Sequence, residues 1–490
     1  MPIADSPLII ACVLTYLASC FGVGIWAMRR THTSADFFLA GKSLGPVVVI
    51  IATISSVMSG FGFVGGPGLV YQSGSSSLWM VFIAAMSLPL SFILVGKRLR
   101  LLVDVRDVLT VPDAVHARYG GRWPSLMMGI AIALGVLGYL GTQVMAIGMV
   151  LRAVLGIELV PALAIGLGVL AFYSVAGGIV AGVYTDLFQG ILMLVASVAV
   201  LLQCLKVGGG MTAITETLWS MDPEFIGPWG TYGAVTAISW VLLFGVGAVG
   251  QPHAITKLMM LKDIRQLKWG GLAAGAGYLV LAMLWMSIGL VMRTLVERGT
   301  HPALESPDLA APVFLLNYTP ELLAGLVFAG LLAAIMSTAD SFLNLGAAAI
   351  VRDIPKAIRG KPIENELYWS RIATGALLVL SAFFALYMEN LIALLGTFGW
   401  GTFAAAIVPS VGMGMNWKRA TGAGCVASIS TSIILNFALE LSARHEIYTL
   451  PHGIAVGAVS LLAAIIVFIG VSLATSPQPL AADIEALIDL

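Results

Sequence analysis

Long uninterrupted apolar runs dominate this chain. Thirteen of them reach about 18 residues or more, the length of helix that crosses the hydrocarbon core of a bilayer. Only 10% of the 490 residues are charged, whereas soluble domains carry about 25%. These features predict an all-α polytopic membrane protein and exclude a soluble enzyme, a nucleic-acid binder and a secreted disulfide scaffold. We place the thirteen spans near residues 7–28, 44–73, 76–96, 124–151, 157–174, 186–205, 231–253, 269–292, 321–350, 372–388, 391–413, 420–441 and 453–474.

The basic residues are distributed unequally between the loops. Alternate loops, including the one that follows the seventh span and begins with Lys257, hold 20 of the 25 Lys and Arg residues. The positive-inside rule makes these loops cytoplasmic, which puts the N-terminus outside and the C-terminus inside. The first run has no basic residue before it and is longer than a signal-peptide core, so we interpret it as a retained helix. We therefore expect a multi-pass protein of the cell inner membrane that contacts the lipid bilayer and functions as a monomer.

Two of the predicted spans are interrupted by helix-breaking residues. The second combines Ser55, Ser56 and Ser59 with a Gly-rich stretch and Pro67. The seventh has a weaker version of this pattern, with three glycines and one proline within residues 244–253. Irregular backbone survives at membrane depth only when it is buried in protein or lines a cavity. The two interruptions lie five spans apart, the pattern of two inverted five-helix repeats with ions and solute at the midpoints. The alternative is that glycine and serine only allow close helix packing.

The ninth span carries polar residues at depth. Ser337, Thr338 and Ser341 lie on one face, because residues three and four apart are neighbours on a helix, and Asp340 lies one turn after Ser337. A carboxylate inside a span is costly and usually functional, and hard oxygen ligands suit a hard cation. The alternative for the hydroxyls is a hydrogen bond to the preceding turn. Asp186 opens the sixth span as a helix cap, as an ion-path carboxylate, or as both.

Other chemistries find no support in the sequence. The four cysteines lie in apolar runs without metal or redox spacing, and the six histidines are scattered. Neither a phosphate-binding Gly-Lys loop nor a Ser-His-Asp set is present, so we expect neither an ATP-driven pump nor an enzyme. Repeated filter loops that would indicate a channel are also missing.

Five blocks together resemble the sodium:solute symporter family, in which bacterial proline and pantothenate carriers are nearest in pattern. The resemblance extends from about residue 33 to about residue 440. The blocks are Ser-Ala-Asp-Phe-Phe-Leu-Ala-Gly-Lys42, Gly-Gly-Pro-Gly-Leu-Val-Tyr71, Gly-Gly-Ile-Val-Ala-Gly-Val-Tyr-Thr-Asp-Leu-Phe-Gln189, Gly-Gln-Pro-His253 and Ala-Ala-Ile-Met-Ser-Thr338.

The resemblance implies a single transporter domain over residues 1–490. Its LeuT-like five-plus-five core, with discontinuous first and sixth core helices, would cover residues 44–413. One extra helix and loop (1–43) would precede the core, and two helices with a short tail (414–490) would follow it. The implied function is import of a small organic solute, such as an amino acid, monocarboxylate or vitamin-like carboxylate, by alternating access with Na+ as the coupling ion. A proton-coupled symporter on the same fold and a transporter-like sensor or receptor stay open as alternatives.

The resemblance also implies site residues. For sodium these are the backbone carbonyls of Ser55, Met58 and Ala334 with the hydroxyls of Ser337 and Thr338. A second sodium would use Asp340 and Ser341, with Asp186 nearby. The expected solute contacts, each of which has core packing as its alternative, are Ser59, Gly60, Phe61, Tyr139, Gln143, Phe244, Ala248 and Trp400. Val57 stands where proline carriers have Asp, and Phe244 and Ala248 replace their aromatic pair, so proline is not the expected solute.

Overall fold

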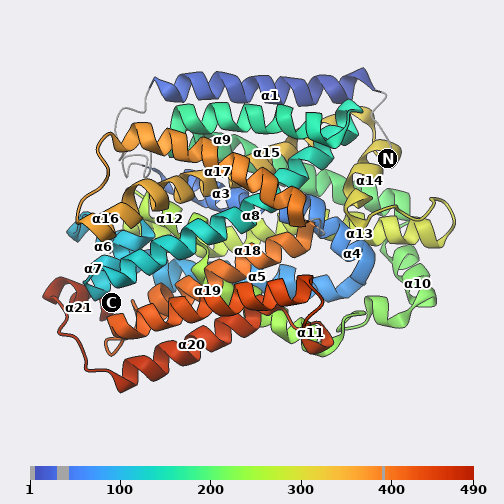
Figure 1. Ribbon diagram of the computed structural model, residues 1–490. Helices are drawn as coiled ribbons and strands as arrows, with labels where there is room; N and C mark the ends of the chain where they lie inside the picture. The colour runs from blue at the N-terminus through green and yellow to red at the C-terminus, as the bar shows by residue number, and fades with distance from the viewer. Residues whose placement is uncertain (1–5, 30–43, 389–391) are drawn as a thin grey trace.

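The computed structural model describes residues 6–29, 44–388 and 392–490, which form one bundle of long helices (Figure 1). Ten helices within these ranges are long and apolar enough to cross a membrane. The described residues contain no β-strand beyond an isolated bridge between Leu44 and Leu261. The all-α multi-pass prediction is therefore confirmed, while the count of thirteen spans stays a prediction. The predicted first cytoplasmic loop, with its block ending at Lys42, lies outside the described residues.

The first half of the chain contains the first of the two interrupted spans. Its helices, in which η marks a short π- or 3-10 segment, are α1 (Pro7–Met28), α3 (Pro46–Val57), η2 (Phe61–Gly65), α4 (Gly66–Ser73), η3 (Gly74–Ser77), α5 (Leu78–Ser91), η4 (Phe92–Gly96), α6 (Lys97–Val105), α7 (Val111–Tyr119), α8 (Trp123–Leu155), α9 (Leu159–Gly208), α10 (Met211–Met221) and η5 (Pro223–Ile226).

The second half of the chain contains the second interrupted span. Its helices are α11 (Gly233–Trp240), η6 (Val241–Val246), η7 (Gly247–Gly250), α12 (Pro252–Met259), η8 (Ile264–Leu267), α13 (Gly270–Glu297), η9 (Pro307–Leu309), α14 (Ala310–Tyr318), α15 (Glu321–Ala348), η10 (Ala349–Asp353), α16 (Ile354–Arg359), α17 (Glu366–Met388), α18 (Ile392–Ile407), η11 (Val408–Met413), α19 (Gly422–Arg444), η12 (Pro451–Gly453), α20 (Val456–Ala474) and α21 (Ala482–Ile488).

The interrupted second span is discontinuous in the structure. Helix α3 ends at Val57, and Met58 turns out of the helix with φ −85° and ψ 109°. Met58 and Ser59 are not helical, and helix resumes at Gly60 and continues through η2 and α4. The break is therefore shorter than the Gly-rich pattern suggested.

The glycines beyond this break are helical and closely packed. A Cβ at Gly66 would overlap the ring of Trp285, and one at Gly68 would lie 2.7 Å from the Pro307 carbonyl oxygen. Unwinding and close packing, posed as alternatives, thus both occur in the second span.

The seventh span is discontinuous as well. It begins as α11, passes through the irregular segments η6 and η7, reaches an extended residue at Gln251 (φ −82°, ψ 109°) and restarts as α12 at Pro252. Proline favours the first turn of a helix, since it has no N–H to leave unpaired there. The predicted discontinuous first and sixth core helices are confirmed.

Helix α9 differs from the expectation of two separate spans. The predicted spans 157–174 and 186–205 form one helix, Leu159–Gly208, which contacts α1, α8 and α15. Glycine is tolerated inside membrane helices, where an open loop would leave backbone groups unpaired. Pro161, in the first turn, is the last proline before the end of α9, so nothing in the sequence forces the helix to stop.

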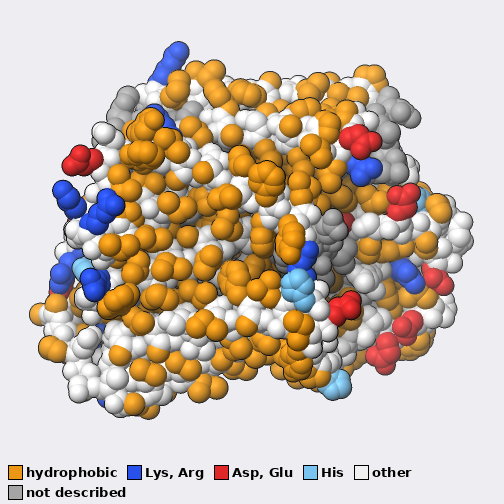
Figure 2. Space-filling view, viewed as in Figure 1, with side chains coloured by type: hydrophobic (Ala, Val, Ile, Leu, Met, Phe, Trp, Pro, Cys, Tyr) orange, Lys and Arg blue, Asp and Glu red, His pale blue; other side chains and the backbone are white. Residues whose placement is uncertain are grey.

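The molecular surface has the polarity of a membrane protein. Figure 2 shows a broad hydrophobic band between two ends that carry the charged side chains. In the view of Figure 1, basic side chains gather at the left end, near α6, α7 and α16, and acidic ones gather toward the right end. Large apolar side chains such as Met86 and Phe383, exposed by 68% and 67%, suit contact with lipid.

Candidate functional site

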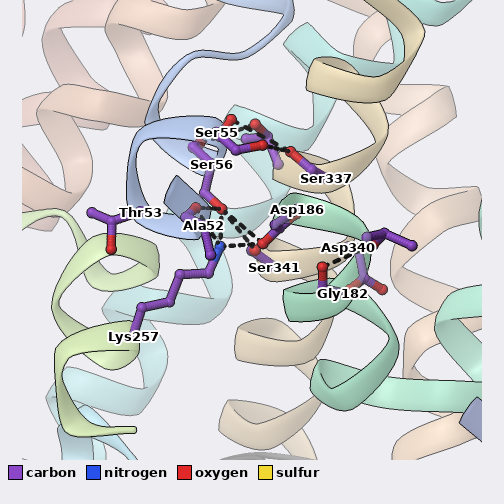
Figure 3. Close-up of polar contacts among 12 residues, drawn as sticks. Ala52, Thr53, Ser55, Ser56, Gly182, Asp186, Lys257, Ser337, Asp340 and Ser341 are labelled. Carbon is purple, nitrogen blue, oxygen red and sulfur yellow. Dashed lines mark hydrogen bonds and ion pairs between the residues drawn. The ribbon is translucent and has the colours of Figure 1, made fainter. Parts of the chain in front are cut away.

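Four helices meet at the break in the second span. Helices α3 and α15 contact each other there, and both contact α9 and α12. Figure 3 shows Ser56, Asp186 and Lys257 facing a common centre. Each of the two broken helices contributes one half to this centre, α3 from the first and α12 from the second. Helices α9 and α15 bring the two carboxylates singled out from the sequence.

The predicted sodium ligands of α3 and α15 converge. The Ser337 hydroxyl lies 3.4 Å from the Ser55 carbonyl oxygen and 3.1 Å from the Ala334 carbonyl oxygen. The Thr338 hydroxyl lies 3.0 Å from the Ala334 carbonyl and 3.0 Å from the carbonyl of Ser56. These hydroxyls and carbonyls form a buried cluster of hard oxygens, which is the type of ligand that a sodium ion takes.

The contacts of Met58 and Ser56 differ from the prediction. Met58 is buried at the end of α3, but no hydrogen bond joins it to the α15 oxygens among the contacts described. The Ser56 carbonyl, which accepts a hydrogen bond from Thr338, was not among the predicted ligands. Its neighbour Ser55 was, so the sequence located the correct turn of the helix but not every carbonyl in it.

Asp186 forms a buried ion pair that the sequence did not predict. Its Oδ2 lies 2.6 Å from Nζ of Lys257, and the two side chains are 0% and 1% exposed. The same ammonium donates to the Ala52 carbonyl at 3.1 Å and to the hydroxyl of Ser56. The assignment of Lys257 to a cytoplasmic loop is wrong, because the chain restarts as α12 after the break and carries Lys257 into the core. The signal available was its position one turn after His253, inside an apolar run.

Asp340 and Ser341 face different neighbours. The Ser341 hydroxyl lies 3.5 Å from the Ser56 hydroxyl, on the Lys257 side of the cluster. Asp340 lies on the other side, beside α9, where a Cβ built on Gly182 would collide with its Oδ2 (Figure 3). Both oxygens of Asp340 are buried without a hydrogen-bond partner among the described residues. The predicted second sodium ligands are neighbours here, but their oxygens do not point at one spot.

The residues predicted for the solute lie beyond the break. The Ser59 and Tyr139 hydroxyls are 3.3 Å apart, and the Gly60 amide donates to Oε1 of Gln143 at 2.9 Å. The ring of Phe61 stacks on that of Phe244 at 5.8 Å.

Two further predicted contacts border this group. The ring of Phe244 packs on that of Trp400 at 5.3 Å. The Ala248 carbonyl accepts a hydrogen bond from Ser91 of α5 at 3.2 Å, which is a contact outside this group. Seven of the eight predicted residues therefore form one buried group around the break.

Three side chains that were not predicted complete this group. The ring of Trp285 packs edge-on against Phe61 at 5.5 Å, and the ring of His253 lies 6.2 Å from Tyr139. Gln251, at the second break, donates to the Trp400 carbonyl at 3.3 Å. His253 and Gln251 belong to the block Gly-Gln-Pro-His253, for which the sequence predicted no role in solute binding. Trp285 lies in an apolar run that offers no pattern by which a solute contact could be predicted.

Several polar atoms in this group lack a partner. Buried polar atoms are normally paired, so an unpaired set at one place indicates where a polar ligand can bind. Among the described residues these atoms are Nε2 of Gln143, Oε1 of Gln251, both ring nitrogens of His253 and Nε1 of Trp285.

Comparisons with known proteins agree with this arrangement. The model of the sodium:solute symporter family matches residues 37–431. A sodium/pantothenate symporter of Haemophilus influenzae is 28% identical over 458 residues, covering 90% of this chain and 93% of its own length. The high-affinity proline transporter PutP of Bacillus subtilis is 28% identical, covering 83% of this chain and 87% of its own length.

A solved structure shares the fold. The substrate-bound, outward-open state of a Na+-coupled sialic acid symporter aligns with a TM-score of 0.79 over 97% of this chain and 100% of that chain. The two sequences are 20% identical, so this likeness concerns the arrangement of helices.

Proposed function

The chain belongs to the sodium:solute symporter family, and we propose that it imports a small organic carboxylate together with sodium. The sodium ion would bind between the broken end of α3 and the middle of α15. Sodium is the coupling ion of the family, and its members transport solutes rather than carry out a chemical reaction. The alternatives of proton coupling and of a sensor are therefore set aside.

The observation that carries the proposed ion site is the convergence of oxygens from two helices. The carbonyls of Ser55 and Ala334 and the hydroxyls of Ser337 and Thr338 are joined by contacts of 3.0 to 3.4 Å. We include the Met58 carbonyl because it belongs to the turn where α3 ends. Sodium bound here would hold α3 against α15 and so favour the state in which the neighbouring break is ordered for solute.

Thermodynamic linkage between the two binding sites then couples the sodium gradient to the solute gradient. Each ligand binds more tightly to the state that the other has ordered, and this coupling is reciprocal. A membrane potential of about 100 mV contributes about 2.3 kcal/mol for each charge moved. Because a carboxylate solute carries one negative charge, its import with one sodium ion moves no net charge and is driven by the sodium concentration gradient. For each further sodium ion, voltage would support roughly fifty-fold accumulation.

The residues around the break favour a carboxylate solute without an ammonium group. Nε2 of Gln143 and Nε1 of Trp285 are unpaired donors that can bind a carboxylate. Val57 offers no charge to an ammonium, and the Asp186 carboxylate is paired with Lys257. Of the two kinds of relative, one transports pantothenate and the other proline. We therefore favour a pantothenate-like carboxylate with an apolar or hydroxylated body over proline.

The charge distribution supports an orientation in the inner membrane. The basic end of the molecule, near α6, α7 and α16, would face the cytoplasm under the positive-inside rule (Figure 2). Helix α1 begins at the end of the bundle opposite to α21 (Figure 1), as an N-terminus outside and a C-terminus inside require. We propose a single transporter domain with its core in residues 44–413, active as a monomer.

The test is a melting-temperature screen of the purified protein. Pantothenate, proline and lactate would each be added in sodium chloride and in choline chloride at equal ionic strength. The proposal predicts a rise in melting temperature with pantothenate in sodium, and none in choline. A response to proline alone would overturn the proposed solute class, and a response equal in both salts would overturn the ion site.

A further inference from the structure

Lys257 lies inside the ion-binding region rather than at the membrane surface. Its side chain is 1% exposed and reaches from α12 toward α3 and α9 (Figure 3). The proposed sodium site accounts for the oxygens of α15 but gives this lysine no role. A buried lysine is expensive unless its charge is paired, so its presence at this position requires a reason.

The ammonium occupies a cation position built from oxygens. It contacts the Ala52 carbonyl at 3.1 Å, the Ser56 hydroxyl, and Oδ2 of Asp186 at 2.6 Å. An ammonium has three donors, and these three acceptors match them. A carbonyl, a hydroxyl and a carboxylate are also the ligands of a sodium ion. Two further oxygens are close to this cage, since Ser341 Oγ lies 3.5 Å from Ser56 Oγ and Oδ1 of Asp186 has no hydrogen-bond partner among the described residues.

Asp186 cannot lose its cation without a large penalty. Its side chain is fully buried, and breaking a buried ion pair by removing one partner is strongly destabilising. If the carboxylate stays ionised while it is buried, either Lys257 or a free cation must therefore neutralise it. The two cannot occupy the same oxygens at the same time.

We propose that the Lys257 ammonium is a cation supplied by the chain itself, which fills the position beside Asp186 and so lowers by one the number of sodium ions that the transporter binds. This inference rests on the proposed function, because it assumes that the neighbouring site binds sodium. It assigns Lys257 as the residue that sets ion stoichiometry and also joins α3, α9 and α12 across both helix breaks.

The test replaces Lys257 and counts sodium. Lys257→Met removes the charge but keeps an unbranched side chain of similar length, and Lys257→Arg keeps the charge as the matched control. Melting temperature is measured against sodium chloride concentration, with choline chloride maintaining ionic strength. Because an ion that binds only the folded state stabilises it by mass action, the slope of melting temperature against log sodium reports the number of ions bound.

The expected result is a steeper sodium dependence in Lys257→Met. The slope should correspond to about one more sodium ion bound than in the wild-type protein. The melting temperature of the variant should be lowered in choline chloride and restored in sodium chloride. Lys257→Arg should keep the wild-type slope. In Lys257→Met combined with Asp186→Asn, which removes both charges, the additional sodium dependence should disappear.

Two results would overturn the inference. One is an equal loss of melting temperature in sodium and choline with an unchanged slope, which describes an ion pair that only holds helices together. The other is a Lys257→Met protein that stays unfolded at high sodium, because sodium then cannot replace the ammonium. Failure of the proposed function would give a different result, since the melting temperature of the wild-type protein itself would then show no sodium dependence.

Discussion

Ser337 and Thr338 are consecutive residues of α15, and each hydroxyl contacts a carbonyl of α3 as well as the Ala334 carbonyl. The sequence predicted this pair because hydroxyls at consecutive positions of an apolar helix are visible without a structure. Of their acceptors on α3, the Ser55 carbonyl was predicted only through the family pattern and the Ser56 carbonyl was not predicted, since carbonyl positions depend on where the helix ends. Lys257 was missed, because its position close behind a span resembles that of a loop residue.

Removal of either hydroxyl should weaken sodium binding. For Ser337→Ala and Thr338→Ala we expect the sodium concentration for half-maximal uptake to rise about tenfold, the effect of losing about 1.4 kcal/mol. Solute binding at saturating sodium should change less. The measurement is initial uptake against sodium concentration, with Thr374→Ala as the control.

Thr374 suits this role because it is a buried threonine whose hydroxyl bonds to the Ser370 carbonyl of the preceding turn, remote from the site. An unchanged sodium dependence in both α15 variants would contradict the site.

Replacement of Asp340 tests whether the protein binds a second cation. Both of its oxygens are buried without a hydrogen-bond partner among the described residues. If it binds sodium with Ser341, then Asp340→Asn should lower the Hill coefficient for sodium toward one and leave the first site working. If it only joins helices, the variant should melt at a lower temperature with unchanged stoichiometry. Sodium stoichiometry and melting temperature measured on the same preparation distinguish these outcomes.

At the scale of the helices, the sequence predicted the positions of the breaks but not the packing around them. The sequence predicted where α3/α4 and α11/α12 are interrupted, because glycine and proline are local signals. It could not predict that η2 and α4 remain helical through Gly62, Gly66 and Gly68, since that depends on the neighbouring Trp285 and on η9. Nor could it show that α9 runs unbroken, because two apolar runs separated by glycines are compatible with either a loop or a helix.

Close packing at Gly66 gives a prediction at this scale. Gly66→Ala should lower the melting temperature and uptake, because the added Cβ overlaps the Trp285 ring and overpacking costs about 1–3 kcal/mol. Gly168→Ala on α9 is the matched control, since that position is exposed and has no atom within 4 Å of an added Cβ. There alanine should be neutral or slightly stabilising. Equal effects of the two variants would show that the packing around α4 is looser than described.

At the scale of the whole molecule, the C-terminal helix docks on the basic end of the bundle. Helix α21 packs on α6 with Ile484, Leu487 and Ile488 buried, and Asp483 pairs with Arg106 at 2.5 Å. The hydrogen bonds from the Arg106 guanidinium hold the pKa of Asp483 below its ordinary value. A carboxylate with a lowered pKa keeps its ion pair as pH falls, and loses it only below the ordinary value of about 3.9. The docked tail should thus be insensitive to pH between 5 and 8.

Burial rather than the exposed ion pair should decide docking of the tail. Exposed pairs contribute at most about 1 kcal/mol, whereas burying an isoleucine contributes about 1.5–3 kcal/mol. Ile484→Asp should increase cleavage within residues 476–490 by about tenfold or more in limited proteolysis. Ala486→Asp, which adds the same charge at an exposed position of α21, should leave cleavage unchanged. Equal cleavage of both variants would contradict docking through the buried face.

Sodium-driven uptake tests the central claim most directly. The purified protein is reconstituted into proteoliposomes with the solute that raises its melting temperature in sodium, and initial uptake is measured under an inward sodium gradient, an inward proton gradient and no gradient. The account predicts accumulation with the sodium gradient alone, and its loss at low sodium in Thr338→Ala but not in Thr374→Ala. Accumulation driven by the proton gradient, or a Thr338→Ala protein as sodium-responsive as wild type, would contradict it.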